Sequence, residues 1–414
     1  MFTFLHAADL HLDSPLRGLD KYDGAPVEEI RAATRRALEN LVSLAIQEKV
    51  SFVVIAGDLY DGDWRDYNTG LYFVSQMVRL KDAGIPVYAV TGNHDAANRI
   101  TKSLRLPDNV KFFSTAMPET MLVEQIDVAI HGQSFENQCT TTDLAKEYPA
   151  PVAGCFNIGV LHTSLSGREG HDSYAPCSEE CLRAKGYDYW ALGHVHTREI
   201  VSEGPIIAYP GNPQGRHVRE AGPKGCLFVK VTDHGEAQVE FRPLDVFRWS
   251  IVEVDVSPAE ELSEVMEAVS TQVRQIYLRA DGLPLAVRIR LTGASPLYHA
   301  IQADHRQLTN DLRALLTDLG SGSIWVEKIV VAVTIAHDPA DSRESLDGPL
   351  QELATYLDET RASSEMRFEL GAELTELARR LPPELAHTIQ TADAAWWSGV
   401  LDEVEAQLVM RLRS

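Results

Sequence analysis

The sequence predicts an α/β protein built from two or three domains. Its length of 414 residues exceeds the roughly 100–200 residues of a typical domain. Short apolar runs alternate with segments whose apolar residues recur at helical spacing, which is the pattern of strands and helices in α/β folds. Hydrophobic residues make up 44% of the chain and charged residues 24%, values near the globular average that exclude a fibrous or wholly disordered protein.

Residues 1–245 are predicted to form the α/β domain. Apolar runs that end at Asp, Gly, Asn or His predict five buried strands, at 2–8, 50–56, 86–91, 156–161 and 187–192. Such runs are typical of a sheet covered by helices on both faces. Helices are predicted behind Pro26, over 26–49, and before Gly84, over 65–83. Later strands follow without long helices between them and predict an antiparallel continuation of the sheet, at 205–209, 225–232 and 236–242.

The rest of the chain is predicted to form two smaller parts. Residues 246–335 show the order strand, helix, strand, helix, strand and predict a small α+β capping domain, at 249–255, 258–279, 285–291, 296–319 and 324–335. Residues 336–414 predict helices interrupted at Pro382-Pro383, with sixteen carboxylates against seven lysines and arginines. Trp396-Trp397 is too apolar for a free end, so it packs inside this part or meets a partner.

Composition limits the partners and the compartment. A total of 38 Lys and Arg against 60 Asp and Glu gives a net charge of −22, which repels a polyanion unless contact is local, metal-mediated or provided by a partner. No apolar run approaches the roughly 20 residues that span a bilayer. The N-terminal MFTFLHAAD lacks a basic segment and predicts a strand, not a secretion signal. Five scattered cysteines argue against a disulfide framework, so a cytoplasmic location is expected.

Polar motifs follow most of the predicted strands in residues 1–245. They are Asp9-Leu10-His11, Gly57-Asp58-Leu59-Tyr60-Asp61, Gly92-Asn93-His94-Asp95, His162 and Gly193-His194-Val195-His196. Sites in open α/β sheets lie beyond the carboxyl ends of the strands, so these side chains are expected to converge. Oxygen and imidazole donors without cysteine suit manganese, iron or zinc.

Seven residues of these motifs match the number of protein ligands that two metal ions about 3.5–4 Å apart require. They are Asp9, His11, Asp58, Asn93, His162, His194 and His196. Asp58 is the expected bridge between the ions. Two such ions hold a phosphate ester, lower the pKa of a water molecule and stabilise the departing oxygen. Gly57, Gly92 and Gly193 allow sharp turns and a close approach of the chain to the ions.

Three further residues beside the ligands are predicted to serve catalysis. His94 follows Asn93 as an imidazole that is not a ligand, placed to stabilise the transition state or to protonate the leaving group. Asp61 and Asp95 are expected to orient histidines by accepting hydrogen bonds.

The order of these motifs resembles the calcineurin-like metallophosphoesterases, whose ligand roles correspond to the seven positions above. The stretches 6–19, 161–178, 186–199 and 209–220 look like those of YhaO-type DNA repair exonucleases, relatives of SbcD. The resemblance implies a two-layered β-sandwich core flanked by helices, with a capping domain and a C-terminal helical region. It also implies two divalent ions, Mn²⁺ above all, and an SbcC-like coiled-coil ATPase that binds the C-terminal region. A homodimer is a further expectation.

Basic residues near the motifs are candidate DNA contacts. They are Arg99, Lys102, Arg105, Arg216 and Arg219. The first three recur every third residue, so on a helix they form either a phosphate-binding stripe or an ordinary solvated face.

Three functions remain open from the sequence. The first is a manganese-dependent DNA exonuclease of DNA repair that also nicks single strands. The second keeps the site but takes a small nucleotide or a phosphoprotein as substrate, which fits the net charge of −22. The third is a subunit that mainly positions DNA for an ATPase, and the intact ligand set counts against it.

Overall fold

The computed structural model describes residues 1–14, 26–61, 67–96, 104–165, 175–336, 348–380, 396–401, 404–405 and 408. Two compact units are distinguished: Met1–Val252 with Ser270–Ile289 and Arg313–Ile329, and Glu253–Val269 with Arg290–Leu312 and Val330–Ser414. The division into 1–245, 246–335 and 336–414 stays a prediction. No helix among the described residues is long and apolar enough to cross a membrane.

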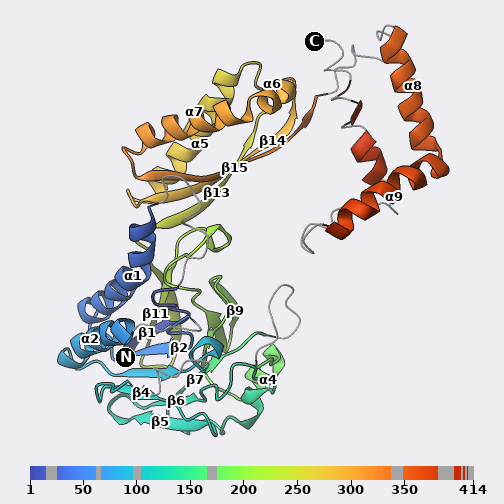
Figure 1. Cartoon of the computed structure of the whole chain (residues 1–414). Coiled ribbons are helices and arrows are strands. Elements are labelled where there is room, and N and C mark those ends of the chain that lie inside the picture. Colours follow the sequence, from blue (N-terminus) through green and yellow to red (C-terminus); the bar gives the residue numbers. More distant parts are fainter. Residues whose placement is uncertain are drawn as a thin grey trace. The chain divides into compact units, whose positions relative to one another are not determined.

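A six-stranded sheet contains the first strands of the chain (Figure 1). Its order is β12 (Ala237–Pro243), β11 (Gly225–Val231), β1 (Phe2–Ala7), β2 (Phe52–Ala56), β3 (Val87–Val90) and β4 (Val110–Phe112). The strands β1 to β4 run parallel, while β11 pairs antiparallel with β1 and β12 antiparallel with β11. The carboxyl ends of β1, β2 and β3 therefore meet at one edge, as the sequence predicts.

A second six-stranded sheet supplies the remaining motif-bearing strands. Its order is β5 (Glu119–Val123), β6 (Val128–Gly132), β7 (Phe156–His162), β8 (Tyr189–Gly193), β10 (Ile206–Tyr209) and β9 (Glu199–Glu203). The inner strands are parallel, and the edge strands β5 and β9 are antiparallel to their neighbours. The parallel pairing of β10 with β8 corrects the prediction that every strand past residue 195 is antiparallel.

The two sheets pack face to face around an aromatic core. Phe4 stacks on Phe52 with ring centroids 5.0 Å apart, and Tyr189 of the second sheet meets Phe4 edge-on at 5.3 Å. Each sheet is thus covered by the other sheet on one face, which corrects the prediction of helices on both faces. An apolar strand needs both faces covered, but its sequence does not say by what.

Helices cover the outer faces of the two sheets. The helices α1 (Val27–Gln47) and α2 (Tyr67–Asp82) lie beside the first sheet (Figure 1). Their apolar side chains are buried against those of β1 and β2. On the second sheet, Trp190 packs with Leu182 of the short helix α4 (Glu179–Ala184) and with residues near the turn η3 (Leu144–Glu147). The predicted two-layered sandwich flanked by helices is confirmed.

The residues after 245 form a smaller sheet and a set of helices. The strands are β13 (Arg248–Asp255), β14 (Leu285–Ser295) and β15 (Ile324–Ile335), in that order. The helices are α5 (Leu262–Arg279), α6 (Tyr298–Ala303), α7 (His305–Leu319), α8 (Gly348–Ala362) and α9 (Ser364–Arg380). The predicted helix 296–319 is divided at Asp304, and Trp397 packs with Leu357 of α8.

Candidate metal centre

The first two ligand-bearing turns are locked to each other by backbone hydrogen bonds. The N–H of Asp9 donates to the carbonyl of Gly57 at 3.0 Å, and the N–H of His11 donates to that of Asp58 at 3.1 Å. Asp9, His11 and Asp58 have φ of 54°, 42° and 52°, in the left-handed region that is unfavourable for side-chain-bearing residues. This strained backbone at two strand ends is typical of functional sites.

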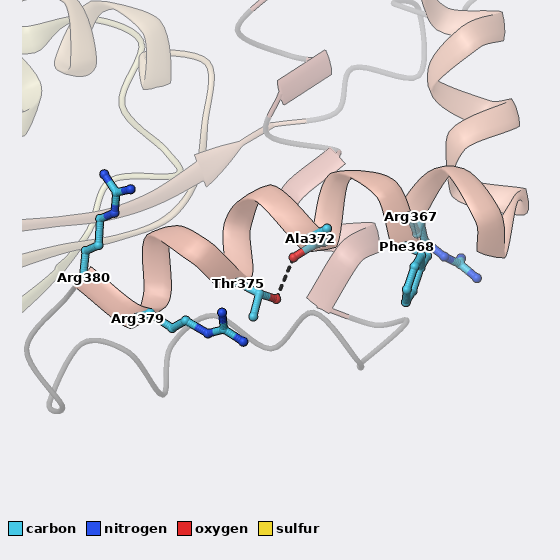
Figure 2. Close-up of a pocket in the computed structure, with 7 residues that line it drawn as sticks. Arg367, Phe368, Ala372, Thr375, Arg379 and Arg380 are labelled. Carbon is cyan, nitrogen blue, oxygen red and sulfur yellow. Dashed lines mark hydrogen bonds between the residues drawn. The ribbon is translucent and has the colours of Figure 1, made fainter.

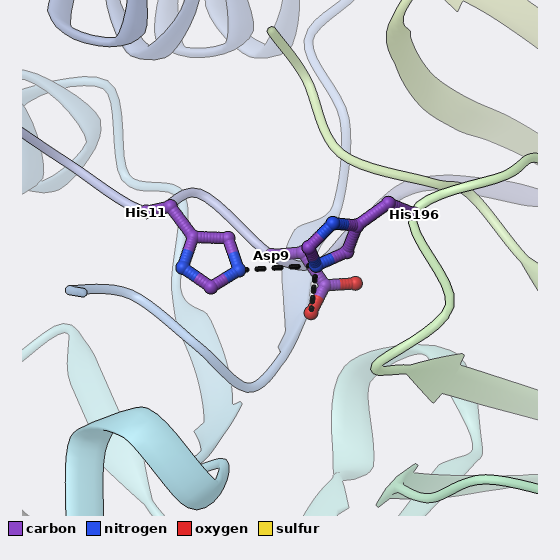
Figure 3. A group of neighbouring side chains, drawn as sticks. All are labelled: Asp9, His11 and His196. Carbon is purple, nitrogen blue, oxygen red and sulfur yellow. Dashed lines mark hydrogen bonds and ion pairs between the residues drawn. The ribbon is translucent and has the colours of Figure 1, made fainter. Parts of the chain in front are cut away.

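Asp9, His11 and His196 form the first group of donor atoms (Figure 3). The Nε2 atoms of His11 and His196 lie 3.1 Å apart, and Nε2 of His196 lies 3.9 Å from Oδ1 of Asp9. The Asp9 carboxylate accepts the backbone N–H of His194 at 3.0 and 3.1 Å. Asp9 and His11 are buried, while 27% of the His196 side chain is exposed.

Asp58, Asn93 and His162 form the second group. Nε2 of His162 lies 3.0 Å from Oδ1 of Asn93 and 3.4 Å from Oδ2 of Asp58. Nδ1 of His162 donates to the carbonyl of Ala56 at 2.9 Å, because a carbonyl only accepts. In the neutral ring the lone pair on Nε2 therefore faces two oxygen atoms, with no proton between them. A cation fits this arrangement of donors.

His196 shows the same pattern as His162. Its Nδ1 lies 2.8 Å from Oε1 of Glu220, so the ring donates its proton to a carboxylate and turns Nε2 toward the first group. Histidines that bind metals commonly donate their second N–H to a carboxylate or a backbone carbonyl. The partners of His162 and His196 are of both these kinds, so the residues present fit a metal site.

Asp58 lies between the two groups. Its Oδ2 is 3.4 Å from Nε2 of His162 and 3.8 Å from Nε2 of His11. Burial alone would raise the pKa of Asp58, but the neighbouring His162 and His94 lower it to about 2. Burial would likewise lower the pKa of His162, yet Asp58 and Asp9 raise it to about 9. The site therefore stabilises positive charge near its carboxylates.

The last predicted ligand, His194, and two glycines lie where the two sheets meet. The His194 ring lies 5.3 Å from that of His162. A Cβ on Gly193 would lie 1.8 Å from the carbonyl oxygen of Ala56, and one on Gly92 would lie 2.2 Å from Oδ1 of Asp58. Glycine is needed at these two positions because only its bare backbone fits there. All seven predicted ligands thus gather where β1, β2 and β3 end beside β7 and β8.

His94 and Asp61 form a pair at the opening of the site. Nδ1 of His94 lies 3.0 Å from Oδ1 of Asp61, and 34% of the His94 side chain is exposed. Burial works to lower the pKa of His94, but the hydrogen bond to Asp61 and the charge of Asp58 raise it. Burial would raise the pKa of Asp61, yet His94, the Ser14 hydroxyl and Arg216 lower it. Asp61 thus orients His94, as the sequence predicts, and His94 also lies near His11 and Asp58 as a candidate metal donor.

The contacts of Asp95 differ from those predicted. Among the described residues its carboxylate accepts backbone N–H groups, from Leu59 at 3.2 Å, Tyr60 at 3.1 Å and Gly92 at 3.1 Å, and contacts no histidine. Burial and the nearby Asp58 raise the pKa of Asp95 to about 7. Asp95 therefore connects the turn after β2 to the turn after β3. Buried backbone N–H groups need an acceptor, so the Asp95 carboxylate accepts from these three amides and not from a histidine side chain.

The predicted DNA contacts divide into three kinds. Arg105 and Arg219 are exposed. Arg216 is nearly buried, with 12% of its side chain exposed, and pairs with Glu220. Arg99 and Lys102 lie outside the described residues.

Sequence reasoning missed Glu220, which holds His196. The one feature of the sequence that could have pointed to Glu220 is its place at the end of the segment from Asn212 to Glu220. In the structure the buried Glu220 carboxylate also accepts a hydrogen bond from the side-chain amide of Asn212 at 2.8 Å.

Family models match two parts of the chain. Residues 2–198 match the calcineurin-like phosphoesterases, and residues 249–334 match the middle domain of the metallophosphoesterase YhaO. The uncharacterized metallophosphoesterase YhaO of Bacillus subtilis is 37% identical over 317 residues, which cover 76% of this chain and 77% of that protein.

A more distant relative and a solved structure are also similar. The DNA double-strand break repair protein Mre11 of Methanopyrus kandleri is 27% identical over 318 residues, which cover 70% of this chain and 65% of that protein. A solved dimetal phosphatase from Danio rerio overlaps 58% of this chain and 99% of its own, at 13% identity and a TM-score of 0.37.

Proposed function

This chain belongs to the calcineurin-like metallophosphoesterases of the YhaO type, and we propose that it is a two-metal phosphodiesterase that degrades DNA from its ends and also nicks single strands. The observation that carries the proposal is the buried set of nitrogen and oxygen donors contributed by both sheets. The family uses a dinuclear metal site, and this chain has candidate ligand groups for one. The similarity to a DNA double-strand break repair protein supports DNA as the substrate.

The ligands divide between two ions in this proposal. Asp9, His11 and His196 would hold one ion, Asn93, His162 and His194 would hold the other, and Asp58 would contribute to both. Imidazole and oxygen donors without a thiolate suit manganese, iron or zinc, and we propose Mn²⁺ because the resemblance to the YhaO-type exonucleases implies it. Two divalent ions bound there lower the pKa of a water molecule and neutralise charge on a phosphate ester.

The chain's own residues supply the proton for the leaving group. His94 is oriented by Asp61 through its Nδ1, so its other nitrogen, Nε2, is free to carry the proton toward the departing oxygen. Burial works to lower the pKa of His94, but Asp61 and Asp58 raise it, which favours the protonated ring. Arg105 and Arg219, both exposed, are the proposed contacts to the DNA backbone.

A degradation assay tests the proposal. End-labelled duplex and single-stranded DNA are incubated with Mn²⁺ and the full chain, beside the small diester bis-p-nitrophenyl phosphate. We expect Mn²⁺-dependent shortening of DNA from its ends as well as hydrolysis of the small diester. Hydrolysis of the small diester with no DNA cleavage under any condition would contradict the DNA substrate and leave the phosphodiesterase intact.

The net charge of −22 favours one second candidate, a phosphoesterase that acts on a small nucleotide or a phosphoprotein. A small substrate needs no extended basic surface. Competition separates the two candidates, because excess duplex DNA inhibits hydrolysis of the small diester only if DNA enters the same site.

We further propose that the C-terminal helices bind a coiled-coil ATPase. Along α9 a groove of about 680 Å³ is lined by Arg367, Phe368, Thr375, Arg379 and Arg380 (Figure 2). An aromatic side chain flanked by arginines suits a partner helix with an apolar and acidic face. Size-exclusion chromatography of the chain with and without such a partner tests this contact and, in the same run, the expected homodimer.

A further inference from the structure

We propose that Arg216 is a catalytic residue that binds a nonbridging oxygen of the phosphate undergoing hydrolysis. This inference rests on the proposed phosphoesterase function and gives Arg216 a contact with the reacting phosphate, in place of a contact with DNA backbone elsewhere. The two ends of the Arg216 guanidinium lie in different surroundings.

One end of the guanidinium is anchored to Glu220. Nη2 of Arg216 lies 2.8 Å from Oε1 of Glu220, and Nε lies 3.3 Å from both carboxylate oxygens. The backbone N–H of Arg216 also donates to Oε2 of Glu220 at 2.8 Å. Two separate parts of Arg216 are thus held by one buried carboxylate.

The other end of the guanidinium faces the metal centre. Nη1 lies 3.7 Å from Oδ2 of Asp61, which is too long for a hydrogen bond. Oδ1 of the same carboxylate contacts Nδ1 of His94 at 3.0 Å. Nη1 and the proposed proton donor therefore approach different oxygens of the Asp61 carboxylate, and in our proposal the phosphate binds beside them.

The segment that carries Arg216 is fixed from behind. Trp249 donates its indole N–H to the carbonyl of Gly215 at 3.1 Å, and Gln214 accepts the backbone N–H of Val246 at 2.9 Å. A Cβ on Gly215 would lie 2.7 Å from the carbonyl oxygen of Glu220, so the turn is tightly packed. A charged donor held in place before the substrate arrives stabilises charge on phosphate without reorganising.

The chemistry of the free end fits phosphate. Guanidinium N–H groups match phosphate oxygens in geometry and remain charged at every physiological pH. Cleavage of a phosphodiester places additional charge on the nonbridging oxygens, and a cation close to the two metal sites offsets it. Within the part of the chain that the structure describes, the contact of Nη1 with Asp61 is too long at 3.7 Å to be a hydrogen bond, so that contact leaves the N–H groups of Nη1 able to donate to phosphate.

Two substitutions test the role with the full chain at saturating Mn²⁺. Calorimetry measures the affinity for inorganic phosphate, and bis-p-nitrophenyl phosphate measures kcat/KM. We expect Arg216→Gln to weaken phosphate binding roughly 10- to 100-fold, the range for a lost hydrogen bond to a charged group, and to lower kcat/KM by at least as much. Arg216→Lys keeps the positive charge but loses the planar arrangement of guanidinium N–H donors. Its phosphate affinity should therefore lie between those of Arg216→Gln and the unchanged chain.

Arg183→Gln is the matched control. Arg183 pairs with Glu179 four residues away, as Arg216 does with Glu220, but lies 43% exposed on α4. The change should leave phosphate affinity, kcat/KM and bound Mn²⁺ as they are. Bound Mn²⁺ is counted in every variant, since a role of Arg216 confined to holding Glu220 and His196 would lower metal affinity instead.

Two outcomes would overturn the proposal. One is unchanged phosphate affinity in a folded Arg216→Gln chain at saturating Mn²⁺, and the other is a defect that occurs only in a parallel series at limiting Mn²⁺ and is absent at saturation. If Arg216→Gln does not fold, Arg216→Lys decides by the same measure, because weakened phosphate binding supports the contact and unchanged binding refutes it. Absence of DNA cleavage does not affect this test, since its probes are inorganic phosphate and a small diester.

Discussion

The metal centre and the C-terminal helices distribute their polar and apolar side chains in opposite ways. In the metal centre Asp9 and His162 have no exposed surface, whereas Tyr356 of α8 is 57% exposed and Phe368 of α9 is 78% exposed. Burying ionisable groups is unfavourable unless counter-charges compensate, and an aromatic ring in water forgoes the stabilisation that its burial provides. The buried ionisable groups fit the bound cations that we propose for the metal centre, and the exposed rings fit the partner surface that we propose for the C-terminal helices.

The two regions also differ in how far protons and metal ions compete for their side chains. Burial raises the pKa of Asp9, although His196 and His162 act against the rise, and the pKa of Asp95 is raised to about 7. The metal centre is thus a place where ions and protons compete. Among the described side chains of α8 and α9 no ionisable group is fully buried, so the helical region lacks this competition.

The largest expected effect comes from removing the central carboxylate. Asp58→Asn should abolish hydrolysis and lose both ions, because Asp58 faces donors of both groups. Asp61→Asn is the control, since Asp61 contacts His94 and should leave metal content nearly intact. Elemental analysis after gel filtration checks both, and two equivalents of metal retained by Asp58→Asn would show that the carboxylate is not shared.

The next largest effect separates chemistry from metal binding. His94→Ala should keep its ions while the rate of hydrolysis falls by about 10²–10⁴, the usual contribution of a general acid. Rates at saturating substrate and metal counts from the same preparation are the measurements. If His94→Ala loses an ion instead, His94 is a ligand, as its position near His11 and Asp58 also permits.

The sequence predicts which polar side chains converge better than it predicts the strands around them. Asp9, Asp58 and His162 follow strands whose apolar runs are unmistakable, and parallel strands bring their ends together. The strands β4, β5 and β6 were not predicted, because β4 and β5 are short and partly exposed and because His131 interrupts the apolar pattern of β6. His131 is accommodated there by hydrogen bonds to Thr120 and Asn157, which are known only from the fold.

The roles of acidic residues are the hardest to predict from sequence. Asp61 and Asp95 occupy equivalent places after strand-end motifs, yet one contacts a histidine and the other contacts three backbone amides. Glu220 lies 24 residues from His196 in the sequence and reaches it only because β10 returns beside β8. Which acceptor meets which donor depends on chain paths that residue types do not specify.

A smaller effect concerns the response of the two regions to acid. His6 is buried between the sheets, with Nδ1 3.0 Å from the Tyr189 hydroxyl, and burial lowers its pKa to about 3. Unfolded His6 takes up a proton below its ordinary value of about 6.5, whereas the folded ring stays neutral to about pH 3. Stability should therefore fall by about 1.4 kcal/mol for each pH unit below 6.5.

His6→Gln isolates this contribution. Urea unfolding at pH 7 and pH 5, followed by tryptophan fluorescence, should show the free energy of unfolding falling by about 2 kcal/mol less in His6→Gln than in the unchanged chain. Parallel losses in the two proteins would mean that His6 does not set the acid sensitivity of the sheet-bearing region.

Salt should have only a small effect on DNA binding. Among the described residues, Arg105 and Arg219 are the exposed side chains proposed to contact DNA, so duplex binding by the isolated chain should be weak and only slightly salt-dependent. Each phosphate contact contributes about −0.9 to the slope of log affinity against log salt. Arg105→Gln and Arg219→Gln should each reduce that slope by about one contact. Tight binding with a steep slope would refute the proposal that DNA is bound mainly at the metal centre while the C-terminal helices bind a partner.

The smallest expected effect on hydrolysis comes from removing the C-terminal helices altogether. Every residue assigned to the metal centre lies at or before Glu220, so a chain that ends at residue 336 should hydrolyse bis-p-nitrophenyl phosphate as the full chain does. The same chain should no longer form a complex with a coiled-coil ATPase, because the groove of α9 is gone. Circular dichroism and metal content show whether the shortened chain is folded. A folded, metal-loaded chain that no longer hydrolyses the diester would mean that the C-terminal helices contribute to the reaction. The two regions would then differ in which side chains they bury but would share one function.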